Sequence, residues 1–151
     1  MSSDLVKLRS IATAHAFRFL ATLGLLNLVW EVAQMPFYTI WQDSTWGEIV
    51  FALAHCTAGD VLIGVFSATG AILLTGMRWP RDACSRLLVI GYFIGISLSY
   101  TIFSELLDVV VWKNWAYSAM MPVVPPLGTG LFPVLQWIIV PIMASWLTLR
   151  K

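Results

Sequence analysis

The sequence predicts an all-α integral membrane protein: a bundle of four transmembrane helices with the N- and C-termini in the cytoplasm. Hydrophobic residues make up 59% of its 151 residues and charged residues only 11%, whereas soluble domains carry about 25% charged residues. The apolar runs are long and show no strict alternation, so they predict helices rather than a β-barrel. The net charge of +1 gives no indication of nucleic-acid binding.

Each of the four apolar runs reaches the roughly 20 residues that a helix needs to cross a bilayer. Pro36 is expected to bend or end the first helix, and residues 1–16 could form a separate amphipathic helix at the membrane surface. The whole chain is expected to form one membrane domain. Its predicted helices cover approximately residues 17–36, 47–75, 86–111 and 131–149.

Two connecting segments are expected to face outward. Residues 37–46 are rich in aromatic and polar side chains, as is typical of a membrane–water interface. Residues 112–130 contain Pro125-Pro126 and Gly128-x-Gly130, which are incompatible with a regular helix. The connection between the second and third helices, residues 76–85, is a basic turn with Pro80.

The distribution of basic residues predicts the orientation. Cytoplasmic loops carry an excess of Lys and Arg, and only Lys113 of the nine basic residues falls in a segment expected to face outward. We therefore predict a multi-pass protein of the cell membrane, or of the inner membrane if the source is bacterial. The eight basic residues of the cytoplasmic side are Lys7, Arg9, Arg18, Arg78, Arg81, Arg86, Arg150 and Lys151.

Ionisable side chains occur inside the predicted helices, where each costs at least about 2.5 kcal/mol in lipid. Such groups are expected to face the bundle interior. Their depth, at 1.5 Å per helical residue, places them in the outer half of the membrane, in one polar pocket that opens outward. The groups are Glu31, His55, Asp60 and Glu105, with Asp108 nearer the surface.

Helical spacing groups these residues into stripes. Asn27, Glu31 and Gln34 lie on one face of the first helix, and Tyr38 extends this face unless Pro36 displaces it. Cys56, Asp60 and Ser67 share a face of the second helix, and His55 lies about 140° away from Asp60. The stripe on the third helix consists of Ser97, Tyr100, Thr101, Ser104, Glu105 and Asp108.

The stripes define the candidate site. Glu31 and Glu105 are the candidate acid–base residues, with His55 as a partner or ligand and Asp60 as an orienting group. The remaining polar residues are candidate ligand contacts: Asn27, Gln34, Tyr100, Thr101, Asp108, Tyr117 and Gln136. A purely structural alternative is a hydrogen-bond network that holds the helices together.

A divalent metal is a further option. Glu31, His55 and Glu105 would supply nitrogen and oxygen ligands suited to zinc, iron or manganese. The sequence contains no HExxH or CxxC spacing, so no metal-binding motif supports this option.

Three functions remain open. The first is binding of, or acid–base chemistry on, a hydrophobic small molecule or membrane lipid. The second is proton- or metal-coupled transport, which Asp60 near mid-membrane favours. The third is an accessory subunit of a larger complex. The small-residue face of Gly91 and Gly95 could serve packing within the chain, a homo-oligomer or a partner subunit.

Overall fold

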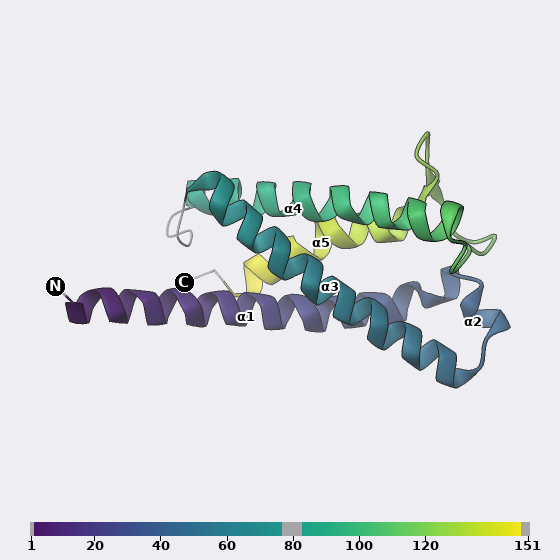
Figure 1. The fold of residues 1–151 in the computed structure, drawn as a ribbon, viewed down its shortest axis with the longest axis horizontal. Coiled ribbons are helices and arrows are strands. Elements are labelled where there is room, and N and C mark those ends of the chain that lie inside the picture. Colours follow the sequence, from purple (N-terminus) through teal and green to yellow (C-terminus); the bar gives the residue numbers. More distant parts are fainter. Residues whose placement is uncertain (1, 77–82, 149–151) are drawn as a thin grey trace.

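Four long helices form the molecule, which is described here from a computed structural model covering residues 2–76 and 83–148 (Figure 1). Side chains are described from Ala14 onward. The chain is mostly helical and has only one small sheet in its described part. The helices are α1 (Ser2–Gln34), α2 (Ile40–Asp43), α3 (Trp46–Thr75), α4 (Ala83–Leu106) and α5 (Leu131–Thr148), with a 3-10 turn η1 (Met35–Phe37) and a π-helical turn η2 (Leu107–Val111).

Four of these segments are long and apolar enough to cross a membrane. They are Ala14–Phe37, Trp46–Thr75, Cys84–Val111 and Leu131–Thr148. Large apolar side chains such as Leu25, Phe66 and Leu87 are more than half exposed on the outside of the bundle. A surface of this kind suits lipid better than water, because contiguous exposed apolar patches are rare on soluble monomers.

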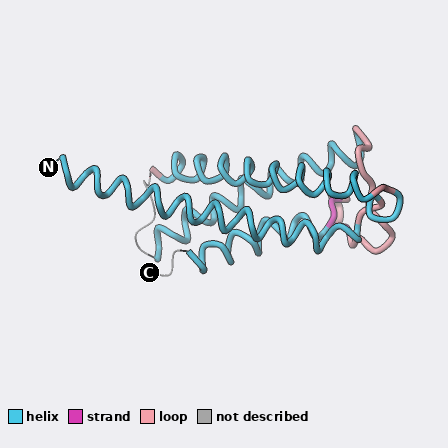
Figure 2. Tube along the Cα trace, turned by 90° about the horizontal axis from the view of Figure 1, so that it is seen from below, coloured by secondary structure: helices cyan, strands magenta, loops and turns pink. Residues whose placement is uncertain are grey.

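The bundle has a square arrangement. Helix α1 packs against α3 and α5, and α4 packs against the same two helices. The 3-10 turn η1, α2, η2 and the connection between η2 and α5 lie together at one end, which we call the loop end (Figure 2). At the opposite end, α3 ends, α4 begins and α1 extends beyond the other helices (Figure 1).

The predicted separate N-terminal helix is not observed. Helix α1 begins at Ser2 and continues without a break into the membrane-length segment. Proline first occurs at Pro36, and it lies in η1 directly after α1 ends. A continuous α1 follows from the absence of an earlier helix breaker, since mixed polarity alone does not interrupt a helix.

Local sequence signals explain both ends of α3. Thr45 Oγ1 accepts a hydrogen bond from the Glu48 amide, and Glu48 Oε2 accepts one from the Thr45 amide at 2.7 Å. This reciprocal pair is a capping box, which satisfies two free amides of the first turn. At the other end, Gly76 adopts a left-handed conformation with φ of 64°, as is common after a helix.

The two segments predicted to face outward are more ordered than the sequence predicted. The short helix α2 lies within residues 37–46, and residues 112–130 contain a two-stranded hairpin. In the hairpin, β1 (Val123–Val124) pairs antiparallel with β2 (Thr129–Gly130). As expected, the described residues of 112–130 form no helix. The predicted helix over 86–111 changes to the π-helical turn η2 for its last five residues.

The bundle interior is divided into two halves. Toward the end where α3 meets α4, it is an apolar core in which Phe19 and Phe93 make an edge-to-face contact at 5.6 Å. Toward the loop end, the buried residues are polar, among them Asn27, Glu31 and Gln136. The apolar core consists of Phe19, Leu23, Ala71, Val89, Phe93, Trp137, Val140 and Ala144.

Candidate functional site

A cleft of about 700 Å³ lies in the polar half of the bundle. Its walls come from α1, α3, α4 and α5, and its rim includes η1, α2 and the segment after η2. Helices α3 and α4 lie together where α3 ends and diverge toward the loop end (Figure 1). Phe51 on α3 and Tyr100 on α4 line the cleft and are 70% and 53% exposed. The cleft therefore opens sideways between α3 and α4.

Gln136 on α5 is the centre of a buried hydrogen-bond network. Its Nε2 lies 2.9 Å from Asp60 Oδ2 on α3, 3.1 Å from Glu31 Oε1 and 3.3 Å from Asn27 Oδ1 on α1. Its Oε1 accepts a hydrogen bond from Gln34 Nε2 at 3.3 Å. One amide thus joins three helices, and every member of the network is buried.

Glu31 and Asp60 form a carboxyl pair within this network. Both accept a hydrogen bond from Gln136 Nε2, and Glu31 Oε1 also accepts from Gln34 Nε2 at 2.8 Å. A carboxyl group can donate a proton when it is protonated and only accepts when it is ionised. The pair can therefore act as a proton donor and acceptor within the cleft.

Glu105 on α4 is the third carboxylate of the cleft, and two tyrosines hold it. Tyr117 donates its hydroxyl proton to Glu105 Oε2 at 2.5 Å and accepts from the Gly130 amide at 2.8 Å. The Tyr38 hydroxyl lies 3.4 Å from Glu105 Oε1. A short hydrogen bond to an ionised acceptor is stronger than a neutral one, so Glu105 has a fixed position.

The backbone brings the two tyrosines together. Tyr38 and Tyr117 form an isolated antiparallel bridge, in which the Thr39 amide donates to the Ala116 carbonyl at 2.9 Å and the Ser118 amide donates to the Phe37 carbonyl at 2.9 Å. This bridge joins the segment after α1 to the segment after η2. It lies at the loop end, where both segments contribute residues to the rim of the cleft.

Both tyrosine hydroxyls favour their protonated form. Burial raises the pKa of Tyr38 well above its ordinary value, and the nearby Glu105 charge raises it further. Burial likewise raises the pKa of Tyr117, and its hydrogen bond to Glu105 acts in the same direction. The two hydroxyls therefore remain hydrogen-bond donors to Glu105 at neutral pH.

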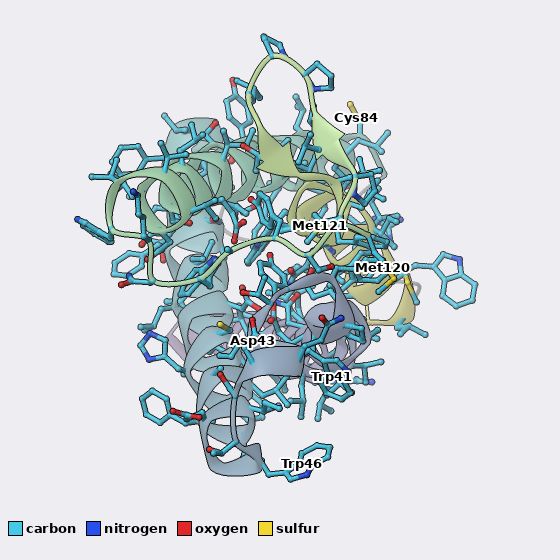
Figure 3. All side chains as sticks on the ribbon, turned by 90° about the vertical axis from the view of Figure 1, so that its right-hand side faces the viewer. Trp41, Asp43, Trp46, Cys84, Met120 and Met121 are labelled. Atoms are coloured by element: carbon cyan, nitrogen blue, oxygen red, sulfur yellow. The ribbon has the colours of Figure 1, made fainter. Side chains whose placement is uncertain are left out.

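Figure 3 shows the molecule from the loop end. Trp41, Asp43 and Trp46 lie along the α2 and α3 side, and the Trp41 and Trp46 rings make an edge-to-face contact at 5.9 Å. Met121 lies toward the middle of this end and is buried, whereas Met120 is 57% exposed. None of these five residues lines the cleft among the residues described.

Two polar groups in the cleft wall have no hydrogen-bond partner. Thr101, only 6% exposed, has an unpaired Oγ1, and the buried Nε1 of Trp115 is also unpaired. Both residues line the cleft. Buried polar atoms without a partner are uncommon and costly, so both groups are available to a molecule bound in the cleft.

Most of the predicted site residues meet in the cleft. Two do not contribute to its described lining: Asn27 is fully buried and hydrogen bonds to Gln136, and Tyr117 hydrogen bonds to Glu105 and Gly130. The predicted residues that line the cleft are Glu31, Gln34, His55, Asp60, Tyr100, Thr101, Glu105, Asp108 and Gln136. Asp108, on η2, also accepts a hydrogen bond from Asn114 Nδ2 at 2.6 Å.

His55 is at the margin of the site. Its exposed ring stacks on Phe51 with a centroid distance of 5.8 Å. In the part of the chain that the structure describes, no group of three or more His, Cys, Asp or Glu side chains is arranged to hold a metal. Among the described residues, the predicted metal ligands Glu31, His55 and Glu105 therefore do not form such a group.

Several residues that line the cleft were not among the predicted site residues. Trp115 and Ser104 line the cleft, as do Trp137 and Pro133 from α5. Tyr38 was placed on the polar face of the first helix but not among the site residues. Its position at the end of the Asn27–Glu31–Gln34 stripe was a usable signal, whereas nothing local distinguishes Trp115 from the interfacial tryptophans.

The Gly91 and Gly95 face of α4 points away from the other helices. A Cβ atom added at either position would meet no described atom within 4 Å. Both glycines line a separate shallow groove of about 830 Å³ with Cys84, Tyr92 and Ser99. The predicted role in packing within the chain is therefore not observed, and a role in association stays a prediction.

Comparison with known proteins gives no relative. No protein-family model matches the chain, and neither a curated protein nor a solved structure is similar to it. The residues that line the cleft are therefore the basis for proposing a function.

Proposed function

We propose that this chain is a membrane protein whose cleft binds the polar end of a hydrophobic small molecule or lipid and exchanges a proton with it. The observation that carries this proposal is the convergence of three buried carboxyl groups on one cleft. Glu31, Asp60 and Glu105 come from α1, α3 and α4. Ionisable residues buried between transmembrane helices usually mark a functional site, because each is costly in lipid.

The side opening supports a hydrophobic ligand. Because the cleft opens between α3 and α4, a molecule dissolved in the bilayer could place its polar end inside and leave its apolar part in lipid. The walls of the cleft combine the three carboxyl groups with apolar side chains such as Met35, Ile63 and Trp137. This mixture of apolar walls and a few convergent polar groups is typical of small-molecule sites.

The chemistry follows from the carboxyl pair. Glu31 and Asp60 are both held by Gln136, and carboxyl groups of this kind can give a proton to a bound group or accept one from it. Glu105 is held by Tyr38 and Tyr117 on the opposite side of the lining and would orient or stabilise the bound group. His55, at the opening, is not required for this step.

A hydrogen-bond network that only holds the helices together would explain fewer of the observed features. It explains why Gln136 on α5 hydrogen bonds to both α1 and α3, but it does not explain an open cleft of about 700 Å³ with unpaired Thr101 and Trp115 groups. Transport is also less well supported. Beyond Asp60 the described interior is mainly the apolar core around Phe19, Phe93 and Trp137, and its buried polar side chains include small serines such as Ser67.

The test is to identify molecules that co-purify with the protein. The protein would be extracted into lipid nanodiscs and its bound small molecules identified by mass spectrometry. We expect the wild type and the control Asp43→Asn, an exposed acidic residue outside the cleft, to retain the same compound. Glu31→Gln combined with Glu105→Gln should lose it. The proposal fails if this double variant, folded by circular dichroism, retains the compound and any turnover of it unchanged.

A further inference from the structure

The charge of the cleft lining is strongly one-sided. It contains five acidic residues and, among the described lining residues, no Lys or Arg. The single side chain there that can become positive is His55, which is exposed at the opening. The acidic residues are Glu31, Glu48, Asp60, Glu105 and Asp108.

The partners of these carboxylates within the protein are neutral. Gln34 and Gln136 donate to Glu31, Tyr38 and Tyr117 donate to Glu105, and Asn114 donates to Asp108. Amides and hydroxyls satisfy hydrogen-bonding capacity but do not neutralise charge. In a low-dielectric cleft an unneutralised carboxylate attracts a cation far more strongly than it would in water.

Aromatic side chains stand beside these acids. Phe51, Tyr100, Trp115 and Trp137 all line the cleft. The face of an aromatic ring attracts a cation, most strongly for Trp and when water is excluded. Acidic and aromatic groups in one wall favour a positively charged head over a neutral or anionic one.

The unpaired groups give independent information on the ligand. The Thr101 hydroxyl is buried and can accept or donate, whereas the Trp115 indole N–H is a donor only. Neither has a partner in the described structure. An ammonium N–H can donate to Thr101, but Trp115 requires an acceptor. A ligand head that satisfies both groups would therefore also carry an acceptor such as an oxygen atom.

We propose that the cleft is selective for an amphiphilic organic amine: a protonated nitrogen with a nearby hydroxyl or carbonyl oxygen, carried on an apolar chain that extends between α3 and α4 into the bilayer. This inference rests on the proposed function and specifies its ligand class. The ammonium lies among Glu31, Asp60 and Glu105, and the oxygen accepts from Trp115. An ammonium in this position also provides the proton that the carboxyl pair exchanges.

The test compares probes that share one chain and differ in charge. N-dodecylethanolamine is a cation at neutral pH, and N-dodecanoylethanolamine is its neutral amide counterpart with the same hydroxyl. Dodecanoate supplies the anion. Binding to the full-length protein in lipid nanodiscs would be measured by calorimetry, after subtraction of partitioning into protein-free nanodiscs. We expect the amine to bind about tenfold or more tightly than the amide, because charge-assisted hydrogen bonds exceed neutral ones, and dodecanoate to bind weakest.

Variants assign the preference to the cleft. Glu105→Gln should remove most of the preference for amine over amide, and Glu31→Gln should do the same if it folds. Thr101→Val, of equal size, should weaken amine binding several-fold, and Asp43→Asn should bind like the wild type. Amine binding that is unaffected by Glu105→Gln would overturn the inference.

The outcomes separate the two proposals. Equal binding of amine and amide, or tightest binding of dodecanoate, overturns the cation inference and leaves the hydrophobic-ligand proposal intact. If none of the probes binds the wild type, the inference is overturned. The proposed function is then judged by the co-purification experiment alone.

Discussion

Tyr117 makes two hydrogen bonds that no other residue can replace. Its hydroxyl donates to Glu105 at 2.5 Å and accepts from the Gly130 amide at 2.8 Å. We predict that Tyr117→Phe lowers the free energy of unfolding by about 1–3 kcal/mol, because it leaves a part-buried amide without its acceptor and a buried carboxylate with one donor fewer. Unfolding of the purified protein in mixed detergent micelles would measure the change.

Tyr92→Phe is the matched control for this prediction. Tyr92 is 46% exposed on α4, and substitutions at exposed positions usually change stability by less than about 0.5 kcal/mol. Equal effects of the two substitutions would show that the Tyr117 hydroxyl contributes nothing specific.

The buried tyrosines also predict how stability depends on pH. The pKa values of Tyr38 and Tyr117 are raised above the ordinary 10.0, so the folded protein retains both protons where the unfolded chain releases them. Their contribution is complete below about pH 10 and is lost as the pH rises above it. We expect the free energy of unfolding to decline as the pH rises above about 10.

The double variant Tyr38→Phe with Tyr117→Phe is the comparison for this pH dependence. It should show a shallower decline over the same range, because its unfolding releases fewer protons. A wild-type profile parallel to that of the double variant would contradict the expected contribution of the two hydroxyls.

At the scale of residues, the sequence was informative where periodicity alone decides position. Asn27, Glu31 and Gln34 share a helical face and are all buried. Gln136 could be selected as a buried polar residue, but its contacts to two other helices depend on how α5 packs against α1 and α3. The Tyr117–Glu105 bond depends on the path of a non-helical segment, and no period predicts such a path.

At the scale of helices, two glycines have opposite surroundings. A Cβ atom at Gly64 on α3 would lie 2.6 Å from Cδ2 of Leu23, which is fully buried on α1. We predict that Gly64→Ala destabilises the protein by about 1–3 kcal/mol, because the packed core leaves Leu23 little room to move. The same unfolding assay would measure this loss.

Gly95→Ala is the counterpart on α4. Its added methyl group would meet no described atom, and Ala is favoured over Gly in a helix by roughly 0.5–1 kcal/mol. We therefore expect a small gain or no change. A marked loss at Gly95 would contradict an open face there and indicate that another chain packs against it.

Strong local signals account for the helix boundaries that the sequence predicted well. Pro36 follows directly on the end of α1, and the Thr45–Glu48 capping box begins α3. The first helix was predicted to begin near residue 17, whereas α1 begins at Ser2. The mixed polarity of residues 1–16 suggested a separate helix, but no proline interrupts the chain before Pro36. The π-helical turn η2 and the β1–β2 hairpin have no comparable local signal, so contacts with neighbouring segments determine them.

At the scale of the molecule, the division of the interior explains why a cleft exists. Large apolar side chains fill the bundle around Phe19, Phe93 and Trp137. Nearer the loop end α3 diverges from α4, and shorter polar side chains occupy the interior (Figure 1). The sequence predicted this polar half from the positions of its acidic residues, but the sideways opening depends on the tilt of α3, which follows from packing.

The orientation in the membrane remains a prediction at this scale, and it can be tested with two cysteines. Asp43, in α2, is exposed at the loop end, and Cys84, in the first turn of α4, is exposed at the opposite end, where α4 begins (Figure 1). Because the predicted cytoplasmic side carries eight of the nine basic residues, the positive-inside rule places the loop end outside. Arg78, Arg81, Arg150 and Lys151, which contribute to this argument, lie outside the described residues.

The labelling experiment uses two variants expressed in a bacterial host. One has Cys56→Ser and keeps Cys84, and the other combines Cys56→Ser, Cys84→Ser and Asp43→Cys. A membrane-impermeant maleimide added to intact spheroplasts should label only the second variant, and permeabilisation should expose Cys84. The reverse pattern would place the loop end in the cytoplasm. Labelling of both variants in intact cells would mean that the two ends are not on opposite sides, which is incompatible with helices that cross the bilayer.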